Sequence, residues 1–305
     1  MRRRNNGGWA RVEMESEKEK KGKKEMGRER REKVGVGVVG WMYTGALLIW
    51  GAWIGLEIAC DGRTDLITVV ASFFLFQTAN IILRSFVSTD PVLVNTSVSL
   101  LHSSLSSSLV LFILLNQWRS AHPSLRLFDH DELVRNTWPF AFKAISLSCG
   151  YFAYDQSDML YHRLYSGCFP SVLAHHFILL LCFSLALFLN VTLNYLLLTL
   201  LCELHSVFLH LRKVRRMAGF RNSASAIVKL EWLLNWSTFI FARLIPHALI
   251  LIKLVRDAPK FDKGIQLPLA CFGMIAMNVL NIGLGFDLFA AYVRDHAPPL
   301  HHHTH

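Results

Sequence analysis

The run from Leu164 to Cys202 contains no Asp, Glu, Lys or Arg. One helical crossing of a bilayer needs about 20 apolar residues, so this run is long enough to cross a membrane twice. A helix in lipid satisfies its own backbone N–H and C=O groups, which water cannot reach there. The run therefore restricts the chain to a membrane-embedded helical fold, because a soluble domain would not leave so long a stretch uncharged.

Shorter charge-poor runs recur in the rest of the chain, which has 305 residues, is 52% hydrophobic and has a positive mean hydropathy. The long run divides near Asn190 and Asn194, while Lys143 and Arg243 each interrupt one of the other runs. We predict an all-α, polytopic transmembrane helix bundle of about eight spans. The candidate spans are residues 34–56, 66–83, 91–118, 138–154, 168–189, 195–211, 232–252 and 264–286.

Both ends of the chain are predicted to be disordered tails. Residues 1–33 carry 13 basic and 7 acidic side chains, and such a segment cannot bury enough apolar surface to offset its ordering entropy. This basic tail either determines topology or also tethers the chain to anionic lipids of the cytosolic leaflet. An N-terminal transmembrane helix is expected at 34–59, and a second tail at 295–305. The sequence pI near 9.5 suggests nucleic acid, but the membrane context argues against such a partner.

Basic residues predict the orientation of the bundle. The loop Arg212-Lys213-Val214-Arg215-Arg216 follows the sixth span, and short loops rich in Lys and Arg stay on the cytosolic side. With an even number of spans, a cytosolic amino terminus also implies a cytosolic carboxyl terminus. We therefore expect both termini to face the cytosol.

Ionisable side chains inside the spans are the strongest chemical signal. His175 and His176 lie in the uncharged run, and Glu203, His205 and His210 follow one helix later. Such residues are costly in hydrocarbon, so they usually face a protein interior and mark a functional site. The alternative interpretation is a histidine that only forms hydrogen bonds between helices, and both interpretations stay open at this point.

Helical spacing places polar residues on one face of each of four spans. We expect these faces to converge on an interior polar chamber, since lipid would reject them. Arg243 and Lys143 are the expected partners of the buried acids, and Pro246 should kink its helix and free a carbonyl. The four faces consist of Asn95, Ser99, His102 and Ser106; Tyr151, Asp155, Asp158 and His162; Glu203, Ser206 and His210; and Asn278, Asn281 and Gly285.

Five motifs resemble the TLC-domain family, over about residues 82–294, with the span at 66–83 preceding this domain. Within that family, the chain is most similar to the group of TLC-domain-containing proteins one and two, which includes a nematode relative active in membrane-fluidity homeostasis. The motifs are residues 95–103, the segment Gly150-Tyr151-Phe152-Ala153-Tyr154-Asp155-Gln156-Ser157-Asp158, the His175-His176 pair, residues 201–213, and Phe241-Ala242-Arg243-Leu244-Ile245-Pro246.

The resemblance implies a regulator of membrane phospholipid acyl-chain composition and fluidity. Such a protein limits polyunsaturated phospholipid in the plasma membrane, with the endoplasmic reticulum as the alternative location. Its partners would be membrane phospholipids and lipid-remodelling enzymes. The residues expected to bind lipid or line the polar chamber are His102, Asp155, Asp158, Glu203, His210 and Arg243.

The same family includes the ceramide synthases, which are acyl-CoA-dependent acyltransferases. Their double histidine is present here as His175-His176, but their following His-Asp-x-x-x-Asp-like segment reads Cys202-Glu203-Leu204-His205-Ser206. This departure favours a protein that is not an enzyme. The alternative is an acyltransferase acting on phospholipid or a sphingoid base, with the histidine pair as base and acyl-CoA as co-substrate.

No metal or other cofactor is expected. His205 and His210 suggest a di-metal lipid oxidase, but such enzymes need several histidine boxes, and the chain lacks a His-x-x-His-His segment. None of the cysteines has metal-ligand spacing.

Overall fold

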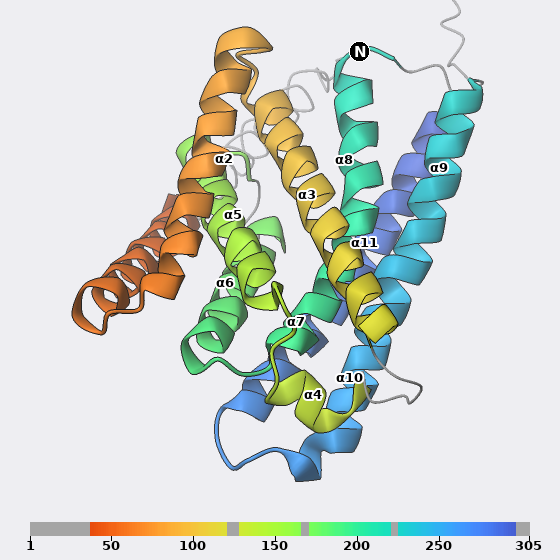
Figure 1. Ribbon diagram of the computed structural model, residues 1–305. Coiled ribbons are helices and arrows are strands. Elements are labelled where there is room, and N and C mark those ends of the chain that lie inside the picture. Colours follow the sequence, from red (N-terminus) through yellow and green to blue (C-terminus); the bar gives the residue numbers. More distant parts are fainter. Residues whose placement is uncertain (1–36, 121–127, 166–170, 221–224, 297–305) are drawn as a thin grey trace, which may run out of the picture.

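The computed structural model describes residues 37–120, 128–165, 171–220 and 225–296. Within these ranges the chain is helical and contains no strand, as predicted. The predicted tail 1–33 lies outside the described residues, and so does the tail 295–305 from residue 297 onward. Figure 1 shows the bundle, whose elements after the first helix are η1 (Thr64–Leu66), α2 (Ile67–Phe86), α3 (Pro91–Ser120), α4 (His130–Val134), α5 (Ala141–Tyr161), α6 (Ser171–Leu189), α7 (Leu193–Thr199), η3 (Leu200–Cys202), α8 (Glu203–Met217), α9 (Ala226–Thr238), η4 (Phe239–Leu244), α10 (Ile245–Asp257), η5 (Ala258–Lys260) and α11 (Gln266–His296).

Seven helices in the described part of the chain are long and apolar enough to cross a membrane. Several are built from consecutive elements: α7, η3 and α8 form one helix, and α9 to η5 form another. The chain is therefore a multi-pass membrane protein. The seven helices are Gly37–Cys60, Thr64–Phe86, Pro91–Ser120, Ser171–Leu189, Leu193–Met217, Ala226–Lys260 and Gln266–His296.

The helix α5 corresponds to the remaining predicted span. It has 21 residues, so it is about 31 Å long and matches the thickness of a hydrocarbon core. It is less apolar than the other seven because it carries Lys143, Asp155 and Asp158. Most of its residues are buried, since it packs against α2, α3, α6 and α7. A polar helix is stable at this depth because protein surrounds it instead of lipid.

Contacts between helix ends show that the long helices, α5 included, run from one end of the bundle to the other. Arg84 at the end of α2 reaches Asp158 near the end of α5, and Arg212 at the end of α8 pairs with Asp295 on α11. These ends lie at the top of Figure 1. At the opposite end, Arg63 donates to the last carbonyls of α6, those of Leu187 and Phe188. The basic segment Arg212-Lys213-Val214-Arg215-Arg216, which was predicted as a loop, forms part of the last turns of α8 and lies at the same end as the α2–α3 connection.

Local sequence explains where several helices begin and end. Asp90 precedes Pro91, and its carboxylate accepts the backbone N–H of Val92 at 2.8 Å, so it caps the first turn of α3. Asn190 and Thr192 adopt positive φ values of 56° and 59°, and the chain reverses there between α6 and α7. The predicted division near Asn190 is therefore correct.

Pro246 changes the geometry of the helix before it. Proline lacks an N–H and its ring clashes with the carbonyl four residues earlier, so a regular α-helix cannot continue through it. Here the chain forms the π-helical segment η4 over Phe239–Leu244 before α10 begins. The carbonyl of Arg243 accepts a hydrogen bond from Nδ1 of His247 at 2.9 Å. The predicted kink thus takes the form of a widened turn, which places Arg243 inside the bundle.

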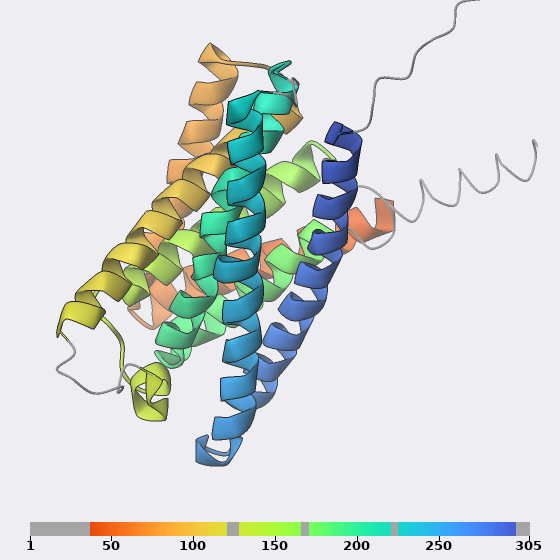
Figure 2. The ribbon, with the colours of Figure 1, turned by 90° about the vertical axis from the view of Figure 1, so that its right-hand side faces the viewer.

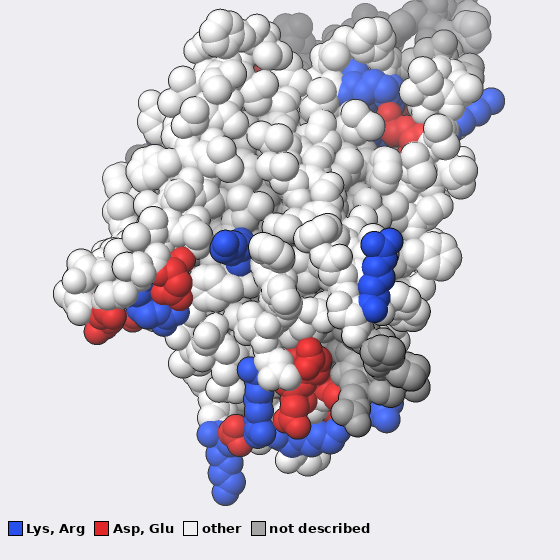
Figure 3. All heavy atoms as spheres, in the orientation of Figure 1, with Lys and Arg blue, Asp and Glu red and all other residues white. Residues whose placement is uncertain are grey.

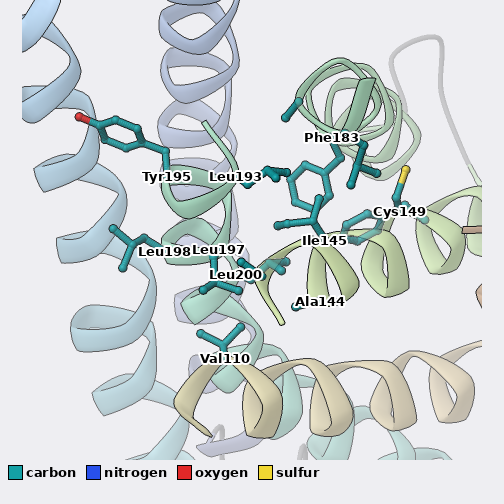
Figure 4. Packing of buried hydrophobic residues seen from close by; sticks show 14 of the residues in the cluster. Val110, Ala144, Ile145, Cys149, Phe183, Leu193, Tyr195, Leu197, Leu198 and Leu200 are labelled. Atoms are coloured by element: carbon teal, nitrogen blue, oxygen red, sulfur yellow. The ribbon is translucent and has the colours of Figure 1, made fainter. Parts of the chain in front are cut away.

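The apolar core lies where α5, α6 and α7 meet, and Figure 4 shows its close packing. Ile145 and Cys149 from α5 lie near Phe183 from α6, while Leu193 of α7 points into the same cluster. Tyr195 belongs to the same cluster, and its ring extends from α7 towards α10, so α7 contributes side chains in two directions. Figure 3 shows that the surface of one face is mostly uncharged, with charged side chains mainly at its lower end and one upper corner.

The first helix, Gly37–Cys60, lies at the edge of the bundle in Figure 1 and behind the other helices in Figure 2, and it is hardly buried. Its contacts include the indole N–H of Trp50, which donates to the Ser184 hydroxyl of α6 at 2.7 Å. Trp53 also packs on Phe188 of α6, with ring centroids 4.0 Å apart. The first helix therefore packs against the outer face of α6.

Candidate functional site

Two aspartates on α5 form the centre of a buried polar chamber. Asp155 and Asp158 both accept from the side-chain amide of Asn95 on α3, at 2.6 and 3.0 Å. Both carboxylates are buried. The shared amide donor holds the two carboxyl groups close together, since its hydrogen bonds partly offset their loss of water.

A second group of donors reaches Asp158 from α2. The Asn80 amide donates to its Oδ1 at 3.2 Å and to the Tyr154 hydroxyl at 2.6 Å. The Arg84 guanidinium donates to the Asn80 carbonyl at 2.7 Å and lies 3.4 Å from the same carboxylate. Asp158 therefore has Arg84 as a neighbouring cation, at the end of the bundle where the basic segment of α8 lies.

The histidine pair places its two rings in different surroundings. His176 is buried on α6, and its Nδ1 lies 3.3 Å from Oδ2 of Asp155, without the angle of a hydrogen bond. His175 is only half-buried and lines an apolar cavity on another side of the helix. Neighbouring residues on a helix point about 100° apart, so one pair serves both the chamber and the cavity.

Glu203 lies at the start of α8, between the chamber and the cavity. Its Oε2 accepts from Ser103 of α3 at 2.7 Å and lies 3.8 Å from Nδ1 of His102. The His102 ring stacks on Tyr151 with centroids 3.7 Å apart, and its Nε2 lies 3.2 Å from the Ser148 hydroxyl. This carboxylate is thus buried among hydroxyl and imidazole groups.

Arg243 is a buried cation with neutral partners. Its guanidinium donates to Nδ1 of His205 at 3.1 Å, to the Ser206 hydroxyl at 2.7 Å, and to the carbonyls of Asn281 and Cys202, each at 3.2 Å. Among the residues that the structure describes, it forms no ion pair. The expectation that Arg243 pairs directly with a buried acid is therefore wrong, although Glu203 lies within its electrostatic range.

Lys143 also differs from its expected role. It is exposed in the first turn of α5, and its ammonium lies 6.0 Å from the centre of the Phe140 ring. Its helix begins at the end of the bundle opposite Asp158, so the lysine cannot neutralise that acid. A charged residue that interrupts an apolar run can lie at the end of a helix or inside the bundle. Its position in the sequence alone does not distinguish these two locations.

His210 extends the chamber along α8. It interacts electrostatically with His102 and His176, and its Nδ1 is buried without a hydrogen-bond partner. One turn later, the exposed Lys213 interacts electrostatically with Asp155. The chamber therefore reaches from the buried carboxylates towards the basic end of the bundle.

An apolar cavity lies between α6, α7, α10 and α11. Its volume, taken as the space open to the centre of a water-sized sphere, is about 80 Å³. Its walls are mostly leucine, isoleucine, alanine and methionine, whereas His175, Glu203 and His247 bring polar groups to one part of it. Leu189, Ile265 and Gln266 line it near the other end of the bundle. A long cavity with apolar walls and a polar end matches a molecule with an apolar tail and a polar group.

The structure thus brings the predicted site residues into one connected region. His102, Asp155, Asp158, His176 and His210 belong to a buried polar cluster, while His175 and Glu203 line the cavity. A hollow chamber inside this cluster stays a prediction. Arg243 contacts Cys202, the neighbour of Glu203. Within the described ranges, no group of three or more His, Cys, Asp or Glu is placed to hold a metal ion.

Sequence reasoning missed several partners that shape this region. Asn80 and Arg84 on α2 hold Asp158, and His247 on α10 lines the cavity. Asn80 and Arg84 are four residues apart, so they lie on one face of the helix. This spacing could have predicted a polar stripe on α2. Nothing local in the sequence indicates that this stripe faces α5.

A helical bundle with buried acids and histidines defines an integral membrane protein with an internal polar site. The family model of the TLC domain matches residues 93–290, so the chain belongs to the TLC domain family. This finding confirms the resemblance drawn from the motifs.

Three relatives extend the comparison, and all are named TLC domain-containing protein 2. The Danio rerio protein is 29% identical over 199 residues, which cover 64% of this chain and 74% of that protein. The Homo sapiens protein is 26% identical over 214 residues, or 69% of this chain and 76% of the relative. The Mus musculus protein is 26% identical over 205 residues, and the match covers 62% of its length. No solved structure matches the chain significantly.

Proposed function

We propose that this protein binds the acyl chain of a membrane lipid in its apolar cavity and thereby regulates phospholipid acyl-chain composition. It limits polyunsaturated phospholipid and so restrains membrane fluidity, acting on phospholipids together with lipid-remodelling enzymes. Its proposed location is the plasma membrane, with the endoplasmic reticulum as the alternative. The observation that carries the proposal is the cavity with its polar part at His175, Glu203 and His247.

The shape and chemistry of the cavity support a lipid ligand. From His175 to Leu189 on α6 is a span of 14 residues, or about 21 Å along the helix axis. Apolar walls of this length bury a hydrocarbon chain, while an imidazole and a carboxylate at the inner end suit a polar head or ester group. Water-soluble ligands would leave such walls without favourable contacts.

The first test is phospholipid acyl-chain lipidomics in cells that lack the protein. The cells would receive the wild type, the variant with both His175→Ala and His176→Ala, or the control His296→Ala at matched membrane levels. His296 is an exposed histidine at the end of α11, distant from the cavity lining. We expect the wild type and the control to lower the polyunsaturated fraction, and the double variant to fail. If the wild type produces no shift, the homeostasis proposal is wrong.

A second candidate function is acyl transfer, and the contact between His176 and Asp155 favours it. An acid beside an imidazole orients the ring and stabilises its protonated form. The imidazole would take the proton of an acceptor hydroxyl or amine as that atom attacks the acyl-CoA carbonyl. The carbon–sulfur bond would break, and the CoA thiolate would leave and take up the proton.

Purified protein incubated with acyl-CoA and a lysophospholipid or sphingoid base distinguishes the two candidates. Release of free CoA together with the acylated product, abolished by His176→Ala, supports acyl transfer. A protein that binds acyl chains without releasing CoA supports the non-enzymatic regulator.

A further inference from the structure

A glycine and a cysteine from two facing helices touch at the wall of the cavity. Gly273 of α11 and Cys182 of α6 both line it, and both lie in its middle part. A Cβ atom built on Gly273 would lie 2.9 Å from Sγ of Cys182. Such a distance is shorter than van der Waals contact allows, so any other residue at position 273 must displace the thiol or fill the space between the helices.

The two residues lie halfway along the cavity. Cys182 is seven residues from His175 at the polar part and seven from Leu189 near the mouth, or about 10 Å along the helix in each direction. An acyl chain whose polar group lies at His175 must therefore pass Gly273 if it is long. A short chain would end before reaching this point.

We infer that Gly273 determines which acyl chains the cavity accepts, because any side chain there would meet the Cys182 thiol and push one of the two groups into the middle of the cavity. The inference rests on the proposed function, since it assumes that the cavity holds an acyl chain. The ligand class is a long, unbranched acyl chain that extends beyond the middle of the cavity.

A purely structural role is the competing explanation, because glycines in membrane helices allow close helix packing. Packing would predict a loss of stability that does not depend on the length of a bound chain. Gly283 provides a matched comparison on the same helix, since it is exposed and a Cβ there meets nothing within 4 Å.

The test uses the full-length protein in detergent micelles with a bound fluorescent fatty-acid probe. Lysophosphatidylcholines with an octanoyl or a stearoyl chain compete with the probe, and thermal unfolding is measured in parallel. We expect Gly273→Val to weaken stearoyl binding by at least about tenfold, because several methylene groups lose their burial, and to change octanoyl binding by less than about twofold. Gly283→Val should leave both affinities unchanged.

Three further variants keep the test informative if Gly273→Val does not fold. Cys182→Phe narrows the same passage from the opposite wall and should reproduce the selective loss of stearoyl binding. Gly273→Ala should cause a smaller loss, because the thiol can rotate away, and adding Cys182→Ala should restore stearoyl affinity.

The outcomes separate the two proposals. Equal weakening of both chain lengths, or no change in any narrowing variant, overturns the role of Gly273 but leaves the lipid cavity in place. Failure of both lysophospholipids to displace the probe from the wild type overturns the proposed function itself.

Discussion

The two halves of the bundle are packed in different ways. Where α5 crosses α2, Gly150 lies so close that an added Cβ would come within 2.3 Å of the Val69 carbonyl oxygen and 2.6 Å of the Ser72 Cβ. Where α6 faces α11, Gly273 borders a cavity, and the atom nearest to an added Cβ is the end of one thiol side chain. The first glycine lets two backbones touch, whereas the second touches only the movable end of a side chain beside the cavity.

This difference suggests that one half mainly stabilises the fold and the other mainly binds the ligand. The packed half, formed by α2, α3 and α5, holds the aspartate pair with amide and guanidinium donors, so its polar groups also connect the helices. The hollow half, formed by α6, α7, α10 and α11, leaves an apolar space beside His175 and Glu203. Substitutions in the packed half should reduce stability, and those lining the cavity should mainly affect ligand binding.

The largest expected effect tests the contact between α2 and α5. Gly150→Leu should reduce the free energy of unfolding by about 3 kcal/mol, because the helices must separate to admit the side chain. Unfolding of the purified protein in mixed micelles measures this loss. Gly283→Leu on α11 should change stability by less than about 0.5 kcal/mol. Equal losses in the two variants would contradict the contrast between the packed and open positions.

The next largest effect concerns the hydrogen bonds by which Arg243 links α8 to α11. Arg243→Met should cost about 2 kcal/mol, because the buried acceptors His205, Ser206 and Asn281 lose their donor. Arg243→Lys should recover only part of this loss, since an ammonium cannot reproduce the planar arrangement of guanidinium donors. The measurement is again unfolding in mixed micelles. Full stability of the methionine variant would show that these hydrogen bonds contribute nothing.

Substitutions of His175 and His176 should affect stability and ligand binding to different extents. His176→Ala removes a buried ring beside Asp155 and should cost about 1.5 kcal/mol, as do many core truncations. His175→Ala trims a half-buried ring and should cost less than about 0.5 kcal/mol, yet weaken displacement of the acyl probe. Unfolding and probe displacement on the same samples test both statements. The reverse order of stabilities would contradict the different surroundings of the two rings.

The smallest effect concerns the first helix, which packs on the outside of α6. Trp50→Phe removes the hydrogen bond to Ser184 and should cost about 0.6 kcal/mol, a typical value for a bond between membrane helices. Acyl-probe displacement should not change, because Trp50 does not line the cavity. A clear loss of binding would show that this helix shapes the ligand site.

The helices and their polar faces were predictable from the sequence because they depend on local spacing. The faces with Asn95 and His102, with Asp155 and Asp158, and with Glu203 and Ser206 all point into the protein, as helical periodicity requires. The break at Asn190 followed from polar residues between two apolar runs. Partner choice was not predictable, as Lys143 and Arg243 show, because a charge pattern does not reveal which helix lies opposite.

The sequence by itself determined that the chain is a helical membrane protein of the TLC domain family, because uncharged runs and short motifs are local properties. Only the tertiary structure decided that α5 is enclosed by other helices and that Asn80 and Arg84 partner Asp158. It also decided that His175 and Glu203 reach one cavity whose middle is bordered by Gly273 and Cys182. Cavities and hydrogen-bonded clusters arise from residues that are distant in the chain, so their positions depend on how whole helices pack.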